Sequence, residues 1–269
     1  MEMFQFDFIR RAFVVATLFS LVAPVLGMYL ILRRQALVAE TLSHVSLMGV
    51  ALGFLIGINP TFVTIIVVGG LALLLEYLRN IYKDYSEVSM AILTASGLSA
   101  ALLINYFNQG NVVSIDQYLF GSIVTVSTEQ LILMGIMTVV VVGLAIIFRK
   151  PMYTLIFDED TAKVQGLPVR LMSQAFMVIT GIVIAMMMPI VGSLLVSAIL
   201  IFPAAISLRL SKRMGGVVAI GTVIALIGLY GGLFVSYYYG TPPGATITGI
   251  YVIIFVLTLL GSKIVNKTK

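Results

Sequence analysis

The chain has 269 residues, of which 60% are hydrophobic and 10% are charged, whereas an average soluble domain has about 25% charged residues. So few polar groups cannot cover a soluble globule, and cysteine is absent, which together exclude a soluble enzyme, a disulfide scaffold, a disordered chain and a thiolate metal site. The composition predicts an all-α polytopic membrane protein, a single transmembrane domain over residues 1–269 that lies in the lipid bilayer. The net charge of +5 is explained better by basic membrane-flanking loops than by a nucleic-acid partner.

Nine apolar runs follow along the chain, most of them close to the roughly 20 residues that cross a bilayer as a helix. They cover 12–32, 36–57, 60–78, 88–105, 130–148, 171–188, 190–208, 216–239 and 246–262. Only Pro189 separates the sixth run from the seventh, so one of these two could be a short, broken helix. The sequence therefore predicts about eight or nine transmembrane helices. No cleavage site follows the acidic N-terminus, so we expect no removable signal peptide.

Two longer segments separate some of these runs. Residues 106–129 contain the amphipathic piece VSIDQYLFGSIVTVS, which predicts an external loop with a short interfacial or re-entrant helix. In residues 149–170, the piece DEDTAKVQG predicts a short helix with Asp158, Glu159 and Asp160 at its positive end and Gly166 as its stop. Such a capped helix has the form of a docking element, although a plain surface turn explains the spacing equally well.

The basic residues set the orientation. Fourteen of the sixteen Lys and Arg residues lie in segments that follow odd-numbered helices: 33–34, 79–83, 149–170, 209–213 and 263–269. Because basic residues concentrate on the cytoplasmic side, we expect these segments and the C-terminus in the cytoplasm, and the N-terminus outside. Arg10 and Arg11 disagree with this assignment, and an eight-helix count with both ends inside would accommodate them.

Several chemistries are excluded by residue counts. A single histidine cannot form an HExxH zinc protease site, and no P-loop for ATP is found. What remains is Glu40 and His44, whose spacing of four puts both on one face of the second helix. Counted from Arg34 at 1.5 Å per residue, they lie ~9 Å and ~15 Å into the membrane. Intramembrane ionisable groups usually line a functional path, although a hydrogen-bonded pair that only ties helices together is the alternative.

Glycines follow on the same helix. Gly49, Gly53 and Gly57 repeat every four residues, a spacing that lets helices pack closely. At 100° per residue, Gly53 lies opposite His44, so the helix is expected to pack through its glycines and to expose Glu40 and His44. Carboxylate and imidazole suit Zn²⁺, Mn²⁺ or Fe²⁺, but two ligands are too few for a tetrahedral zinc site unless a two-fold dimer doubles them.

At these residues the sequence resembles a known family. AETLSHVSLMGVALG at 39–53, DQYLFGSIVTVS at 116–127, FDEDTAKVQGLPVR at 157–170 and PIVGSLLVSAILIFPAAISLRL at 189–210 are similar, in this order, to segments of the ABC-type zinc and manganese permeases, the ABC-3 family. The resemblance spans nearly the whole chain and is strongest to the zinc-uptake permeases. One departure is Glu40, because the family usually has Asp at this position.

The resemblance implies a type II ABC importer permease that works as a homodimer with a cytoplasmic ATPase dimer and an extracellular metal-binding protein. It implies that Glu40 and His44 contact the transported ion, Zn²⁺ or alternatively Mn²⁺, and that no cofactor is permanently bound. It also implies that DEDTAKVQG, with Ala162 at its centre, is the coupling helix that docks on the ATPase. The remaining alternatives are a manganese or iron permease of the same family, an ion-coupled secondary metal transporter and a structural membrane protein.

Overall fold

The computed structural model describes residues 7–82, 85–108, 115–121 and 126–267. Within these ranges the chain forms helices and no strands, and nine of the helices are long and apolar enough to cross a membrane. These are α1 (Asp7–Leu32), α2 (Val38–Ile56), α3 (Pro60–Ile81), α4 (Ser86–Phe107), α6 (Thr128–Ile147), α9 (Val169–Val191), α10 (Ser193–Leu210), α11 (Met214–Tyr239) and α12 (Pro243–Lys267). Each matches one predicted apolar run, which supports the higher of the two predicted counts.

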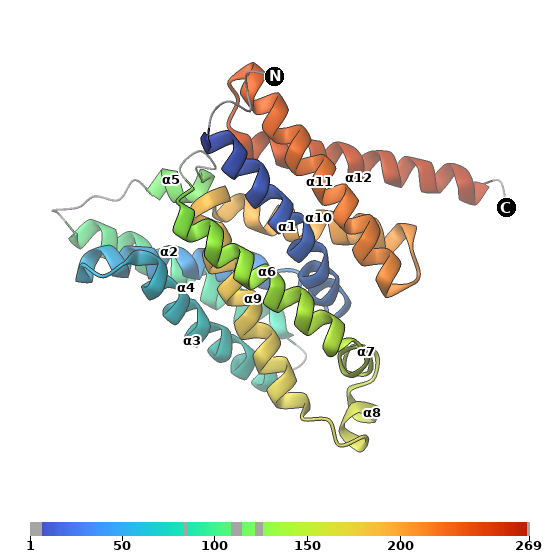
Figure 1. Ribbon diagram of the computed structural model, residues 1–269. Helices are drawn as coiled ribbons and strands as arrows, with labels where there is room; N and C mark the ends of the chain where they lie inside the picture. The colour runs from blue at the N-terminus through green and yellow to red at the C-terminus, as the bar shows by residue number, and fades with distance from the viewer. Residues whose placement is uncertain (1–6, 83–84, 109–114, 122–125, 268–269) are drawn as a thin grey trace.

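The long helices form two groups around a shared centre. Helices α2, α3 and α4 pack together on one side, and α11 and α12 lie on the other, with α1, α9 and α10 between them (Figure 1). In the most apolar stretch of α1, 72% of the residues are buried by the rest of the protein. In the corresponding stretch of α12, only 11% are buried. A helix that is apolar all round but buried on only one side needs lipid on the other, so α12 and the similarly exposed α6 form the outer wall.

The break between α9 and α10 lies at Gly192, so the prediction that Pro189 separates the helices is wrong. Pro189 lies inside α9, where Gly192 N–H donates to Met188 O at 2.8 Å and closes the last turn. Gly192 has φ +87° and ψ +149°, a backbone conformation that side chains disfavour. A Cβ at Gly192 would also collide with the backbone of Leu119 and Phe120, so this glycine lets a short helix approach the break.

That short helix is α5 (Ile115–Phe120), within the predicted loop of 106–129. It contacts α9 and α10, while residues 109–114 and 122–125 of the same loop lie outside the described ranges. Two further short helices, α7 (Arg149–Phe157) and α8 (Glu159–Val164), occupy the segment of 149–170. The sequence predicted α8 but not α7, because nine residues with a proline near the start give too short a periodic signal.

Candidate metal pathway and coupling region

Glu40 and His44 lie on one face of α2. Glu40 is exposed in the single chain, and His44 is half-buried. The two residues are close enough for Glu40 to act electrostatically on the imidazole. The His44 Nδ1 atom is shielded from solvent and has no hydrogen-bond partner among the described residues, so no hydrogen bond from this atom ties the imidazole to a neighbouring helix.

The opposite face of α2 is packed tightly. A Cβ at Gly49 would come within 2.7 Å of Thr64 Cα, and one at Gly53 would come within 2.6 Å of Pro60 Cα, so only glycine allows α3 to approach so closely. Gly57 does not pack against another helix as Gly49 and Gly53 do. It is the left-handed C-cap of α2, with φ +69° and nothing within 4 Å of its Cβ position, so it ends the helix and does not pack against another.

A third side of α2 packs against α4. The Thr94 hydroxyl donates to Thr41 Oγ1 at 3.0 Å, and a Cβ at Gly97 would come within 3.1 Å of the Val45 backbone. Close contacts on two sides hold α2 in place, so the Glu40 and His44 side chains project from a rigid support.

The structure places the pair near the start of α2. Arg34 lies in a turn with φ +57°, and the helix begins at Val38, not next to Arg34. Glu40 is therefore in the first helical turn, and His44 lies ~9 Å along the helix from Val38. The positive end of the α2 dipole also favours a carboxylate at position 40.

Helix α10 contacts α2 and is itself partly exposed. Leu194 is 54% exposed, and Ser197 and Ile201 are partly exposed on the α10 side. The described residues contain no group of three or more His, Cys, Asp or Glu side chains that could hold a metal ion. One chain thus offers a carboxylate and an imidazole on a surface open for a further partner, which is half of a tetrahedral ligand set.

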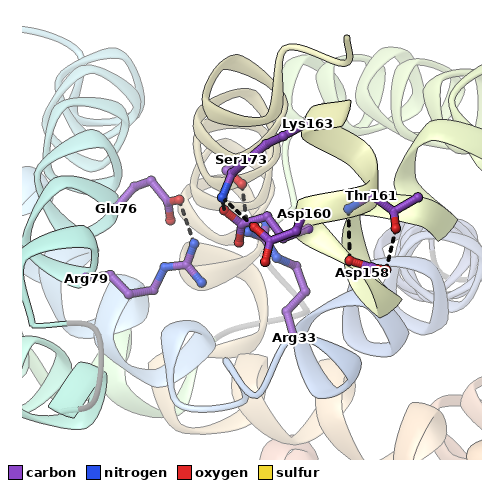
Figure 2. A network of polar contacts seen from close by, with 9 residues as sticks. Arg33, Glu76, Arg79, Asp158, Asp160, Thr161, Lys163 and Ser173 are labelled. Atoms are coloured by element: carbon purple, nitrogen blue, oxygen red, sulfur yellow. Dashed lines mark hydrogen bonds and ion pairs between the residues drawn. The ribbon is translucent and has the colours of Figure 1, made fainter. Parts of the chain in front are cut away.

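The predicted coupling helix α8 begins with a complete N-cap. The Asp158 carboxylate accepts from Thr161 N at 2.9 Å and from the Thr161 hydroxyl (Figure 2). The Thr161 hydroxyl, followed by backbone N–H groups, lowers the pKa of the Asp158 carboxyl. On the next turn, Lys163 Nζ lies 3.0 Å from Glu159 and 3.3 Å from Asp160, and these hydrogen bonds raise the pKa of Lys163. These local pairs fix a helix of only six residues in the predicted place.

Only one side of α8 is buried. Ala162 is fully buried where α8 meets α7 and α9, whereas Glu159, Asp160 and Val164 face outward. Val164 is 88% exposed, and the sequence had not singled it out. Gly166, with φ +75°, ends the segment as predicted, and Leu167 N donates to Ala162 O at 3.1 Å to close the helix. The exposed surface is small and acidic with an apolar tip.

A buried polar network lies beside α8 at the ends of α1, α3 and α9 (Figure 2). Arg33 Nη2 donates to Ser173 Oγ at 2.7 Å, and Arg79 Nη2 donates to Glu76 Oε1 at 2.7 Å. Burial, followed by the charge of Arg79, lowers the pKa of Arg33 to about 10, while Glu76 opposes this change. A cavity of about 720 Å³ extends from Glu76 to Lys163 and connects this network with α8. The sequence offered a signal for it, a single Glu in the apolar run LLLEYLRN.

Replacing Glu76 by alanine should destabilise the protein by about 3 kcal/mol or more, because Arg79 would lose the carboxylate that pairs with it and Arg33 would lose a carboxylate that offsets its buried charge. The midpoint of thermal unfolding in detergent measures this. Glu87→Ala, at an exposed site, should change stability by less than about 0.5 kcal/mol. Equal unfolding midpoints for the two variants would show that the Glu76–Arg79 ion pair does not stabilise the protein.

Residues 5–262 match the sequence model of the ABC 3 transport family. The chain is 32% identical to a Treponema pallidum protein named "Probable metal transport system membrane protein", over 96% of both chains. It is 27% identical to the high-affinity zinc uptake system membrane protein ZnuB of Haemophilus influenzae, over 95% of this chain and 98% of that protein. A relative from Halalkalibacterium halodurans, 26% identical over 97% of this chain and 89% of its own, is named for manganese transport.

The fold also matches a solved structure. PsaBC from Streptococcus pneumoniae, determined in complex with a Fab, superposes with a TM-score of 0.84 at 25% identity, covering 95% of this chain and 92% of that one. The likeness includes almost every long helix, so it extends well beyond the segments around Glu40 and α8.

Proposed function

Because the chain belongs to the ABC 3 transport family and is a multi-pass metal-ion permease of that family, we propose that it imports zinc across the cytoplasmic membrane. It is a transport subunit and not an enzyme, since members of this family use a separate ATPase chain. The observation that carries the zinc proposal is the pairing of Glu40 and His44 on the open face of α2, with an unpartnered imidazole nitrogen.

The ligand count supports a two-fold assembly. One chain supplies one nitrogen and one carboxylate, whereas Zn²⁺ takes four ligands. A second copy that meets this one across the shared α2 and α10 face would bring two imidazoles and two carboxylates together. Carboxylates can bind through one oxygen or two, so such a site would release the ion as well as capture it. The metal is cargo here, and the proposal includes no permanently bound cofactor.

The choice of zinc over manganese is part of the proposal. An imidazole nitrogen suits zinc, whereas carboxylate oxygens bind both ions. His44 therefore favours zinc, and Glu40 does not discriminate between zinc and manganese. Relatives named for zinc and for manganese both resemble this chain, and Glu40 stands where the family usually has Asp. Iron transport by a chain of the same family is a further alternative, since one Haemophilus influenzae relative is named for it.

The growth of cells that lack the permease tests which ion it transports. Cells that lack this protein should stop growing in zinc-depleted medium and should recover when Zn²⁺ is added, because the proposed import route is missing. Plasmid-borne permease should restore growth, and a plasmid carrying His44→Ala should not. Rescue by Mn²⁺ alone would make manganese the cargo and would require a different role for His44.

We further propose that α8 docks on a cytoplasmic ATPase dimer and that an extracellular metal-binding protein delivers the ion to the other side. The observation that supports this proposal is the exposed outer surface of α8, formed by Glu159, Asp160 and Val164. The opposite side of the helix is held by the Asp158 N-cap and the buried Ala162. A partner that receives it would need an apolar pocket for Val164 and basic groups near the acidic first turn.

The proposed orientation places α8 and the C-terminus in the cytoplasm, because fourteen of the sixteen basic residues lie on that side. In intact cells, a membrane-impermeant maleimide should not label Lys163→Cys, although the position is exposed, and should label it after permeabilisation. Ile58→Cys, in the exposed turn after α2, should react in intact cells. The native chain has no cysteine, so any signal reports the introduced thiol. Labelling of Lys163→Cys from outside would invert the orientation.

A further inference from the structure

A second cavity lies outside the proposed metal pathway. It encloses about 250 Å³ between α1, α6 and α9, and the start of α7 lies at one end. Its lining is apolar apart from the Tyr29 hydroxyl and includes Leu26, Val141, Ala145 and Phe176. An apolar cavity of about 150 Å³ already takes benzene, so this one has room for part of a hydrocarbon chain.

The cavity lies in one half of the membrane. Its α1 and α6 residues come from the last turns of those helices, and its α9 residues come from the first turns. All three ends adjoin the basic segments that the proposed orientation places in the cytoplasm. The inner wall of the cavity is formed by core residues such as Leu26 and Phe176, and because α6 is the least packed of the three helices, we expect the outer side to adjoin the inner leaflet.

Helix α7 has the form of an interfacial helix at the mouth of this cavity. Met152 and Leu155 are buried against the protein, whereas Tyr153 and Phe157 are exposed with their rings 4.7 Å apart. Aromatic side chains concentrate at the level of lipid headgroups. Met152 also lines the cavity, so α7 closes its cytoplasmic end.

Basic side chains gather at the same mouth. Arg149 and Lys150 begin α7, and both are exposed. Arg149 is close enough to the cavity residue Tyr29 for an electrostatic interaction, and its guanidinium lies 3.9 Å from the Cβ position of Gly215, just after Lys212 and Arg213. Among the described residues, no acidic side chain forms an ion pair with Arg149 or Lys150.

We propose that this site binds an anionic phospholipid of the inner leaflet, with one acyl chain in the cavity and the phosphate at Arg149 and Lys150. The apolar lining matches the acyl chain, and the unpaired cations match the headgroup. The bound lipid would support α7, which passes directly through Asp158 into α8, and so would steady the coupling region. The side of the membrane rests on the proposed orientation, but the lipid contacts do not depend on the transported ion.

The test compares two lipids with identical dioleoyl chains, phosphatidylglycerol and phosphatidylcholine, added to the delipidated full-length permease in detergent. Native mass spectrometry should show preferential retention of phosphatidylglycerol, and that lipid should raise the thermal unfolding midpoint more than phosphatidylcholine does. Arg149→Gln combined with Lys150→Gln should remove the preference, because each basic group near an anionic headgroup favours binding about fivefold. Lys163→Gln combined with Arg170→Gln, with the same charge change elsewhere on this side, should keep it.

Filling the cavity tests the acyl-chain half of the site. Ala145→Phe should reduce retention of both lipids, whereas Ala219→Phe, on an exposed part of α11, should not. Equal retention of the two lipids by the wild-type protein, or an unchanged preference after the Arg149 and Lys150 substitutions, would overturn the proposal. If Ala145→Phe does not fold, the charge variants decide the outcome alone. None of these results bears on zinc, so failure here is distinguishable from failure of the proposed function.

Discussion

Replacing His44 by alanine should lower zinc uptake by about 100-fold or more, to the rate of vesicles without the permease. Loss of a group that merely supports a metal ligand already costs about 10–100-fold, and His44 is proposed as a ligand itself. Its side chain is only half-buried, so its removal should leave membrane insertion and ATPase binding intact. Uptake into membrane vesicles that contain equal amounts of permease measures the effect.

Variants at neighbouring positions separate ligand loss from helix damage. Glu40→Gln keeps the shape but removes the charge and should also abolish uptake, whereas Glu40→Asp should retain much activity, because a carboxylate remains. Leu37→Ala, at the exposed apolar N-cap residue of α2, should transport zinc normally. Wild-type uptake by His44→Ala would assign the pair a role in helix packing.

Replacing Gly166 by valine should disconnect the permease from its ATPase while the chain still reaches the membrane. Gly166 has φ +75°, where a β-branched residue is strained by roughly 1–3 kcal/mol. Nothing lies within 4 Å of its Cβ position, so the penalty arises from the backbone and not from a collision. The chain should relieve it by distorting the end of α8. Co-purification of the ATPase and ATP-driven transport should both be lost.

Gly166→Asn is the matched control, because asparagine adopts the left-handed conformation more readily than valine. It should bind the ATPase and retain most of the transport activity. If valine and asparagine behave alike, backbone conformation at Gly166 does not govern docking, and α8 would lose its proposed role as the coupling element.

Apolar runs predicted the transmembrane helices well, because a bilayer leaves few alternatives to a helix of this length. The details that failed depend on backbone conformation and contacts with distant residues. Pro189 is the stronger local signal for a break, yet the chain breaks at Gly192, where α5 needs close access to the backbone. Helix α7 was missed because it has nine residues and only two of them, Met152 and Leu155, are buried, which is too short an apolar pattern to recognise.

At the candidate site, too, the features fixed by helix geometry were predicted, whereas those that depend on backbone conformation were not. A spacing of four was enough to place Glu40 and His44 on one helix face, since helical geometry fixes it. The start of α2 at Val38 was not predicted, because the chain turns at Arg34 and residue spacing does not reveal a turn with positive φ at an arginine. The glycine pattern predicted close packing at Gly49 and Gly53 but could not distinguish Gly57, which caps the helix.

The most direct test of the central claim is metal uptake into proteoliposomes that contain the permease and its ATPase, with the metal-binding protein added outside. With ATP enclosed at the ATPase side, radioactive zinc should accumulate. Omission of ATP should abolish this accumulation, and equimolar manganese should compete poorly. Manganese accumulation without zinc accumulation, or zinc accumulation that does not require ATP, would contradict the identification of this chain as a zinc importer subunit.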